Sequence, residues 1–224
     1  MAMAPKQDSR LKLLEATLNV VREKGYTASR IDDVCAEARL TKGSFFHHFE
    51  SKEDLALTAA ELWGTQVCKV FAAAPYRKLD DPLDRLLGYV AFRKALLVGD
   101  ISTYACFAGT VIQEVHELHP HLRDACAQTI DDHVADLEGM VAEALQSRGL
   151  QAAWTAESLA LFMQAALQGA LILAKARQSA DPAIASLDHL YRYLEKIFAD
   201  TSKTSSRGRH GGGGQRSNLR KEIS

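Results

Sequence analysis

Residues 29–54 read SRIDDVCAEARLTKGSFFHHFESKED, and this stretch decides the fold of the chain. Two short helices are predicted here, separated by a break at Ala38–Thr41. The second, Lys42–Phe49, has only about two turns and places basic and polar residues among three phenylalanines. A helix this short adds little to a core, so its expected use is to be displayed by the helices around it. We interpret the stretch as a helix-turn-helix that presents a short helix to DNA.

Hydroxyl residues mark the predicted helix starts in this region. Ser29 with Asp32 forms an S-x-x-D arrangement before the first short helix, and Thr41 is the candidate cap of the second. Ser51 begins a long helix that runs to about residue 74. Upstream, an apolar stripe from Ser9 to Lys24 predicts a further helix that ends at a glycine. The N-terminal part of the chain is therefore predicted to be a three-helix unit followed by a long fourth helix.

The rest of the chain shows helical spacing and no β pattern, so the fold class is predicted to be all-α with about nine helices. Further helices are expected at residues 83–98, 103–118, 120–147, 155–178 and 181–198. We divide the chain into a head at 1–54, a helical body at 55–200 and a basic Gly/Ser/Arg-rich tail at 201–224. The tail has too few apolar residues to offset its ordering entropy and is expected to be disordered.

Composition limits the classes of function. Four widely spaced cysteines without a CxxC pair indicate neither a disulfide framework nor a zinc site. The N-terminus lacks the apolar run of a signal peptide, and no stretch has about 20 uninterrupted apolar residues, so a cytoplasmic protein with no membrane partner is expected. The formal net charge is −1, and acidic and basic residues balance within residues 1–55. DNA binding would therefore depend on where charges are placed.

Residues 27–55 resemble the TetR family of bacterial transcriptional regulators. The resemblance rests on Gly25-Tyr26 after the first helix, the T-x-x-x-I-x-x-V-x-x-x-A run from Thr27 to Ala38, and the segments TKGSFFHHF and SKEDL. It implies a helix-turn-helix DNA-binding domain joined by the long fourth helix to a helical ligand-binding and dimerisation domain. It further implies a repressor that leaves a palindromic double-stranded DNA operator when a small molecule or an electrophile acts on the body.

The resemblance also implies which residues contact DNA. The corresponding positions in this chain are Arg30, Thr41, Lys42, Gly43, Ser44, His47, His48 and Lys52. The start of the short helix favours a phosphate, because its unpaired N–H groups and positive dipole end attract anions. Phe45 and Phe49 are interpreted as packing residues. Phe46 departs from the family, which usually has a tyrosine there whose hydroxyl reaches a phosphate.

The helix at 155–178 is apolar on almost every side and contains small residues that allow close approach of another helix. Together with the stripe on the last helix, it predicts a homodimer built as a four-helix bundle. The alternative is that this helix is the central core helix of a monomer.

The effector pocket is expected among the helices of the body. Its candidate lining and sensor residues are Phe92, Tyr104, Cys106, Phe107, Gln113, Glu114, Phe162, Gln164, Gln168 and Lys175. Cys106 lies near a helix start, where the dipole favours a thiolate, and it is interpreted either as a reactive sensor thiol or as a small core residue.

Other classes of function find less support in the sequence. The histidines at 116, 119 and 121 do not follow the spacing of a standard metal site, so no metal is assigned. There is no nucleophile elbow, phosphate loop, HExxH or paired-carboxylate motif, and neither an enzyme nor a cofactor is expected. A helical interaction protein with a degenerate DNA-binding head remains an alternative to the regulator.

Overall fold

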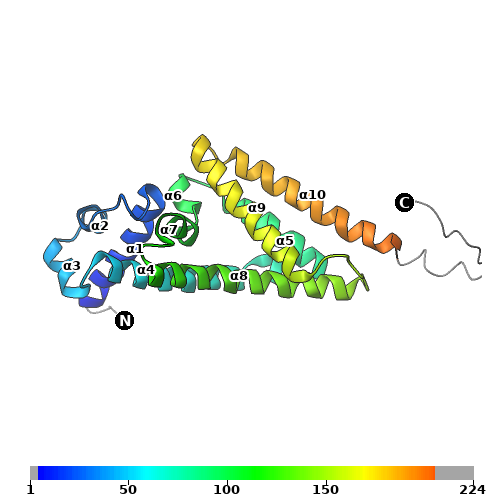
Figure 1. Ribbon diagram of the computed structural model, residues 1–224, viewed down its shortest axis with the longest axis horizontal. Coiled ribbons are helices and arrows are strands. Elements are labelled where there is room, and N and C mark those ends of the chain that lie inside the picture. Colours follow the sequence, from blue (N-terminus) through cyan, green and yellow to red (C-terminus); the bar gives the residue numbers. More distant parts are fainter. Residues whose placement is uncertain (1–4, 205–224) are drawn as a thin grey trace, which may run out of the picture.

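The computed structural model describes residues 5–204, with side chains from residue 8 to residue 199, and contains only helices, turns and loops in this range. Figure 1 shows a small head of short helices at one end of an elongated helical body. The elements are α1 (Pro5–Lys24), α2 (Ile31–Ala38), α3 (Lys42–His48), α4 (Lys52–Ala72), the 3₁₀ turn η1 (Pro75–Lys78), α5 (Pro82–Ala95), α6 (Ile101–Tyr104), α7 (Phe107–Val115), α8 (Pro120–Ser147), α9 (Ala156–Arg177) and α10 (Asp181–Thr204). The all-α prediction is confirmed.

The caps of α3 and α4 lie where the sequence places them. The Thr41 hydroxyl accepts a hydrogen bond from the backbone N–H of Ser44 at 3.2 Å, and the Ser51 hydroxyl accepts one from Asp54 N–H at 3.1 Å. Each cap satisfies an N–H group that has no partner within its helix. Phe45 is fully buried below α3, whereas the next residue, Phe46, is 60% exposed.

The predicted cap of α2 is wrong by one residue. The helix begins at Ile31, and Arg30 is its N-cap. The Asp33 carboxylate, and not that of Asp32, accepts the Arg30 backbone N–H at 2.8 Å. The Ser29 hydroxyl instead donates to the carbonyl oxygen of Gly25, closing the preceding turn. Ser29 is buried, so its hydroxyl takes the nearest buried backbone acceptor.

The turn between α2 and α3 depends on a residue in the left-handed region. Arg39 has φ 54° and ψ 43°, and its N–H bonds to the Ala36 carbonyl at 3.1 Å. The next N–H, of Leu40, bonds to the Cys35 carbonyl at 2.9 Å. These bonds close α2 without a glycine and direct the chain into α3. The unfavourable left-handed conformation of Arg39 is therefore part of the turn between the two helices of the helix-turn-helix.

The single helix expected at 103–118 is wrong, because the chain forms the one-turn α6 and then α7. Ala105 and Cys106 have extended ψ angles of 141° and 115°, which interrupt the helix. The Cys106 sulfur accepts a hydrogen bond from Gly109 N–H at 3.3 Å, so Cys106 is the N-cap of α7. This break accounts for the extra α-helix among the described residues relative to the expected nine.

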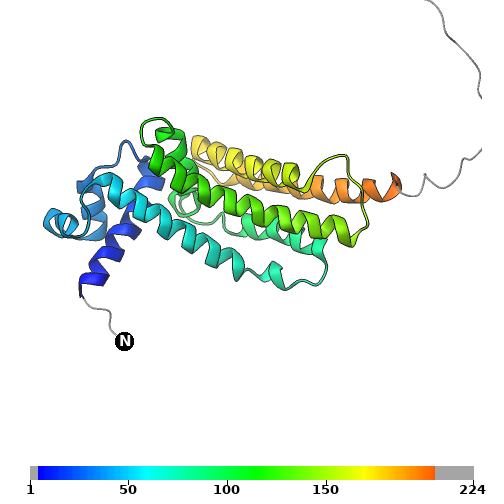
Figure 2. The ribbon, with the colours of Figure 1, turned by 60° about the horizontal axis from the view of Figure 1, so that its bottom comes forward.

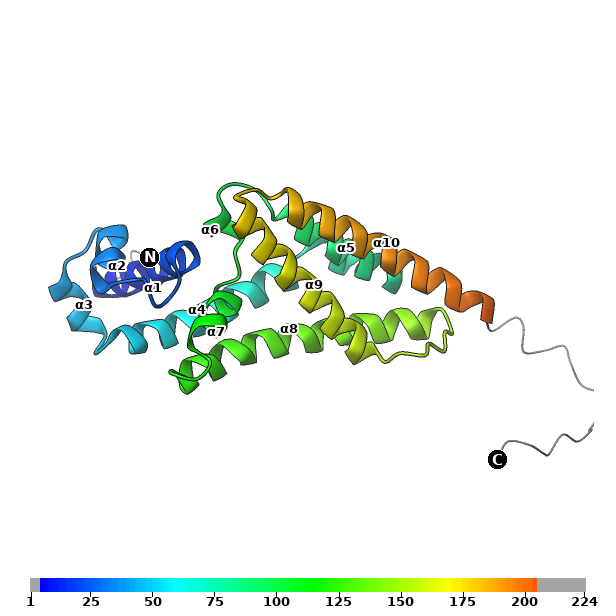
Figure 3. The ribbon, with the colours of Figure 1, turned by 45° about the horizontal axis from the view of Figure 1, so that its top comes forward.

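The body is a layered arrangement of long helices. In Figure 2, α4 and α8 run side by side from the head into the body, while α9 and α10 form an antiparallel pair. Figure 3 shows α9 crossing from the α6 end of the body to the far end of α8, with α5 against α10. A hydrophobic cluster joins α4, α5, α8, α9 and α10. α10 continues to Thr204, and the remainder of the predicted tail, 205–224, lies outside the described residues.

α9 is the one helix of the described residues that has the length and apolar composition of a membrane span. Its inner side packs on α8 and α10 through Leu159, Met163, Leu167 and Leu171, all of which are buried. A central core helix meets the same criteria of length and composition. The packing accounts for the inner half of its apolar surface.

The head does not have a core of its own. The cluster that contains Phe45 and Phe49 also includes Leu55 and Ala59 of α4, Val111 of α7 and Cys126 of α8. The physical unit around the helix-turn-helix therefore crosses residue 54 and reaches the start of the body. Position and orientation of the head are set by packing against α7 and α8 as well as by α4.

Phe45→Ala is expected to destabilise the protein by about 3–5 kcal/mol, because it removes a fully buried ring from this shared cluster. Phe46→Ala, one residue further along α3, is the matched control and is expected to change stability by less than about 0.5 kcal/mol. Urea unfolding followed by circular dichroism measures both. Equal losses in the two variants would contradict the assignment of Phe45 to the core.

Candidate functional site

The residues predicted to contact DNA lie on and around α3, at the end of the molecule farthest from α10 (Figure 1). Five of them are exposed: Arg30, Thr41, Lys42, Gly43 and His47. Ser44 and His48 are half-buried, and the fully buried side of α3 is formed by Phe45. The structure thus presents the polar side of a two-turn helix to solvent while phenylalanine anchors the other side.

Lys42 is not a free cation in this conformation. Its ammonium group lies 2.8 Å from the Asp32 carboxylate, and this hydrogen bond raises the pKa of Lys42. Both side chains are more than half exposed, so the pair adds little to stability. Lys42 can therefore exchange Asp32 for a phosphate at little cost.

Gly43 leaves open space above the start of α3. A Cβ at this position would meet only the Thr41 hydroxyl, at an ordinary contact distance of 3.6 Å. Packing within the chain therefore does not require glycine here. A helix interior also disfavours glycine by roughly 0.5–1 kcal/mol relative to alanine. The missing side chain at Gly43 leaves the backbone at the start of α3 open to close approach by a binding partner such as DNA.

Two of the predicted contact residues are held against the head. The His48 Nε2 lies 2.7 Å from the Ser9 hydroxyl of α1. The Lys52 ammonium lies 4.3 Å from the centre of the Tyr26 ring, and burial lowers the pKa of Lys52. A cation stacked on an aromatic face has a restricted orientation. These two residues are better suited to positioning than to reading bases.

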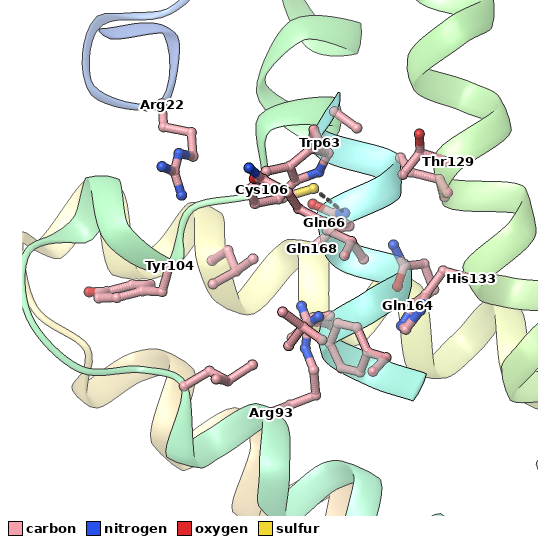
Figure 4. A pocket seen from close by; sticks show the side chains of 18 of the residues that line it. Arg22, Trp63, Gln66, Arg93, Tyr104, Cys106, Thr129, His133, Gln164 and Gln168 are labelled. Atoms are coloured by element: carbon pink, nitrogen blue, oxygen red, sulfur yellow. Dashed lines mark hydrogen bonds between the residues drawn. The ribbon is translucent and has the colours of Figure 1, made fainter. Parts of the chain in front are cut away.

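The body contains a cavity of about 270 Å³ between α4, α5, α8 and α9, which we call the central cavity. Figure 4 shows its lining side chains converging from these helices and from the α6–α7 segment. Four residues expected in the pocket line it: Tyr104, Cys106, Gln164 and Gln168.

Sequence reasoning missed the charged and aromatic residues of the same cavity. They are Arg22, Trp63, Arg93 and His133. A signal was present, because Arg93 follows Leu86 and Val90 at helical spacing, and His133 precedes Leu137 by four residues. A polar residue at a position of the apolar stripe faces the interior and merits consideration as a ligand contact.

His133 contributes hydrogen-bonding groups but no charge to the central cavity. Its Nε2 lies 2.8 Å from the Tyr89 hydroxyl, and its ring packs 4.9 Å from that of Phe71. Burial lowers the pKa of His133 to about 4, with Arg93 as a further cause. His133 is therefore neutral at pH 7.

Cys106 lies where the central cavity meets a second one. Its sulfur accepts hydrogen bonds from Gly109 N–H at 3.3 Å and from Gln168 Nε2 at 3.4 Å. Gly109 permits this arrangement, since a Cβ there would lie 2.5 Å from Gln168 Oε1. The Lys175 ammonium donates to the Thr110 hydroxyl at 3.2 Å, and burial lowers the pKa of Lys175.

The second cavity, which we call the lateral cavity, has a volume of about 220 Å³ between α7 and α9. It includes the expected residues Gln113, Glu114 and Lys175, together with Cys106 and Gln168. Glu114 lines the lateral cavity and also contacts the head. Its carboxylate accepts the backbone N–H of Thr27 at 2.7 Å, and a Cβ on Gly25 would lie 2.1 Å from it. Gly25, with φ 88°, is required both by its conformation and by this close approach.

Three phenylalanines expected in the pocket line neither cavity. Phe92 packs on Phe71 and Tyr76 beside the central cavity, with ring centres 5.7 and 5.8 Å apart. Phe107 is fully buried against Trp63. Phe162 lies on the outer, exposed side of α9 against Tyr193. Aromatic residues at helical spacing do not by themselves distinguish core, cavity and surface.

Comparison with known proteins covers both parts of the chain. Residues 13–59 match the model of bacterial regulatory proteins of the tetR family, and residues 82–187 match that of the LmrA/YxaF-like transcriptional regulator C-terminal domain. The HTH-type transcriptional repressor DhaR of Mycobacterium sp. strain GP1 is 26% identical over 77% of this chain and 85% of its own length. The transcriptional regulator AcuR of Cereibacter sphaeroides is 26% identical over 76% of this chain and 78% of its own length.

The fold agrees with these matches. A TetR transcriptional regulator from Chloroflexus aurantiacus superposes with a TM-score of 0.77 at 24% identity, covering 87% of this chain and 98% of that structure. These relatives are transcriptional regulators and not enzymes. The two matched regions together span more than half of the chain, and they include both the displayed helix α3 and the helices around the cavities. The chain therefore belongs to the TetR family of bacterial transcriptional regulators.

Proposed function

We propose that this protein is a dimeric cytoplasmic repressor that binds a palindromic operator through α3 and is released when a small molecule or an electrophile acts on the body. The observation that carries the proposal is the exposed polar side of α3 in a chain that also has an exposed apolar face on α9. Two copies joined through that face would present two reading helices. The similarity to the repressor DhaR supports repression, as opposed to activation, of transcription.

The proposed dimer interface is the outer side of α9. Four large apolar side chains on this side are between 47% and 51% exposed, namely Leu161, Phe162, Ile172 and Leu173. Gly169 lies between them, and a Cβ built on it meets nothing within 4 Å, so the space above it is open. Large apolar side chains around a small-residue gap suit the close approach of a second helix. Tyr193 extends the face onto α10.

Signal transfer would use contacts between head and body. The Glu114 carboxylate bonds to Thr27 N–H, and the Glu53 carboxylate lies 3.2 Å from His119 Nδ1 at the start of α8. Two reading heads must enter successive major grooves about 34 Å apart. A small rotation of α4 against these contacts would change the separation of the heads and prevent simultaneous docking. The effector must then bind the two states with different affinity.

Operator binding tests the proposed function directly. Fluorescence anisotropy with DNA from the region upstream of the protein's own gene is expected to show tight binding that weakens steeply with salt, because phosphate contacts release counterions. Absence of binding at low salt would instead support a helical interaction protein with a degenerate head.

Gly43→Ala is expected to leave the fold intact and to weaken operator binding roughly tenfold or more. The chain has room for the added Cβ, and alanine favours a helix, whereas a DNA backbone in contact with Gly43 would clash. Thermal unfolding and anisotropy measure the two effects separately. Gly139→Ala is the matched control, because its Cβ also meets nothing within 4 Å but lies on α8. Unchanged affinity of Gly43→Ala would contradict the placement of DNA over the start of α3.

Leu173→Glu is expected to convert the dimer into a monomer, since it would place two like charges within the apolar interface. Light scattering after size-exclusion chromatography measures the mass. The control is Leu118→Glu, at a residue 80% exposed near the start of α8 and away from the α9 face. A wild-type protein that is monomeric, or a Leu173→Glu variant that remains dimeric, would exclude this interface.

Glu114→Ala is expected to release the turn that joins α1 to α2. Loss of the carboxylate removes the partner of Thr27 N–H, so exchange of this amide with deuterium should accelerate. Operator affinity should fall, because a head with more orientations loses more entropy on docking. Gln113→Ala is the control, since its side chain bonds only within α7. Unchanged Thr27 exchange would rule out Glu114 as a link between body and head.

A further inference from the structure

The central cavity has an uneven charge. Two arginines, Arg22 and Arg93, contribute to its wall, whereas none of its lining residues is an aspartate or a glutamate. His133 is neutral at pH 7, because burial lowers its pKa to about 4. Most of the remaining lining is aliphatic or aromatic. The cavity therefore offers positive charge in apolar surroundings, where an anion interacts more strongly than in water.

Arg22 is already engaged by the protein. Its guanidinium stacks on Trp63 at 5.2 Å from the ring centre and donates to the carbonyl oxygens of Leu18 and Thr103 at 2.9 and 3.1 Å. A further bond reaches the Asn19 side chain at 2.8 Å. These contacts use the donors on all three guanidinium nitrogens. Arg22 therefore forms part of the cavity wall, and its contacts within the protein hold its guanidinium in place.

Arg93 has no such partners. Its guanidinium lies 5.0 Å from the centre of the Phe71 ring, and within residues 8–199 no hydrogen bond or ion pair engages it. Figure 4 shows the side chain extending from α5 toward the middle of the cavity. The contact with Phe71 restrains the guanidinium without using its N–H donors. A planar fork with an open edge matches a carboxylate in a two-bond geometry.

A second unpaired group lies in the same wall. Gln164 is 8% exposed, and its side-chain oxygen is buried without a hydrogen-bond partner among the described residues. Figure 4 places Gln164 beside His133, on the α9 side of the cavity. A buried acceptor without a partner destabilises the protein, because it has lost its hydrogen bonds to water. A ligand that donates a hydrogen bond to this oxygen would remove that cost.

The size and lining of the cavity limit the remaining choices. Its volume of about 270 Å³ is slightly below the range of roughly 300–1,000 Å³ that is typical of ligand sites, so a small ligand is favoured. Trp63, Phe71 and Leu167 are suited to an apolar body. Among the described residues, Arg93 is the lining arginine whose guanidinium has no hydrogen-bond partner, so the wall offers one open binding group for an anion, and the apolar surroundings disfavour a second anionic group. These limits favour a monocarboxylate over a phosphate ester.

We propose that the effector of the central cavity is a small, mostly apolar monocarboxylic acid that also has a hydrogen-bond donor. Arg93 binds its carboxylate, and Gln164 Oε1 accepts its hydroxyl or N–H group. Only the consequence of binding, release of the protein from DNA, rests on the proposed function. The binding itself is a property of the cavity and is measurable without an operator.

A matched set of probes tests the ligand class on the full-length protein by isothermal titration calorimetry. The set contains phenylpropanoate with a hydroxyl group para to the chain, phenylpropanoate without it, and the primary amide of the hydroxylated acid. Saturated straight-chain acids from acetate to octanoate form a size series. The hydroxylated acid is expected to bind more tightly than its amide by roughly ten- to a hundredfold, because the amide lacks the charge that Arg93 pairs.

Two variants assign the groups. Arg93→Met keeps the apolar stem and should reduce binding of the acid to that of the amide. Gln164→Leu removes the acceptor and should abolish the preference for the hydroxylated acid over phenylpropanoate. Lys94→Met is the matched control, because Lys94 is the neighbouring cation on α5 but pairs with Asp188 at 2.6 Å outside the cavity. Circular dichroism melting verifies that each variant is folded.

The proposal is overturned if the amide binds as tightly as the acid, if Arg93→Met binds the acid as the wild type does, or if no acid in either series gives saturable binding. Anisotropy with upstream DNA on the same preparation separates this failure from failure of the proposed function. Operator binding without acid binding retains the regulator and excludes the ligand class. Acid binding that depends on Arg93 without operator binding retains the ligand class and excludes the repressor.

Discussion

The shared hydrophobic cluster around α1, α4, α7 and the start of α8 is the constraint on which the rest of the structure depends. α3 has only seven residues, too few to form a stable helix alone. It is held because Phe45 and Phe49 enter a cluster that also contains Val111 and Leu122 of the body. The same packing that makes the short helix possible fixes its direction relative to the cavities. The head and the start of the body therefore form one packed unit.

Near-neutral charge in the head is compatible with this role because several of its acidic groups are engaged locally. Asp33 bonds to Arg30 N–H and lies 3.0 Å from the Lys24 ammonium, and these contacts lower the pKa of Asp33. Glu53 faces His119, on the body side of the head. The exposed pair of Lys42 and Asp32 is the exception, since docking would exchange one anion for another. Placement of charge, more than its sum, governs the attraction to phosphate.

Sequence patterns predicted the helices well and the cavities only in part. Thr41 and Ser51 could be identified as caps because capping depends on a few neighbouring residues. The break before α7 was not predicted, because its N-cap is Cys106, and a cysteine is not among the usual capping residues. Gln164 and Gln168 stood out as polar residues in an apolar helix, whereas Phe162 shares their helix and faces outward. Which side of α9 faces inward is decided by its packing on α8 and α10, and helical periodicity does not show that side where a helix is apolar on almost every side.

Arg22 shows that the cavity and the head are not separated by a domain boundary. It belongs to α1, the first helix of the head, yet its guanidinium lies in the wall of the central cavity and bonds to Thr103 of α6. Its guanidinium also stacks on Trp63 of the long helix α4. Arg22 and Trp63 therefore bring α1 and α4 to the wall of the same cavity. A ligand moves an equilibrium only by the difference between its contacts in the two states. Under the proposed function, contacts of an effector with Arg22 and Trp63 would supply such a difference, since these residues come from the two helices whose relative position sets the head.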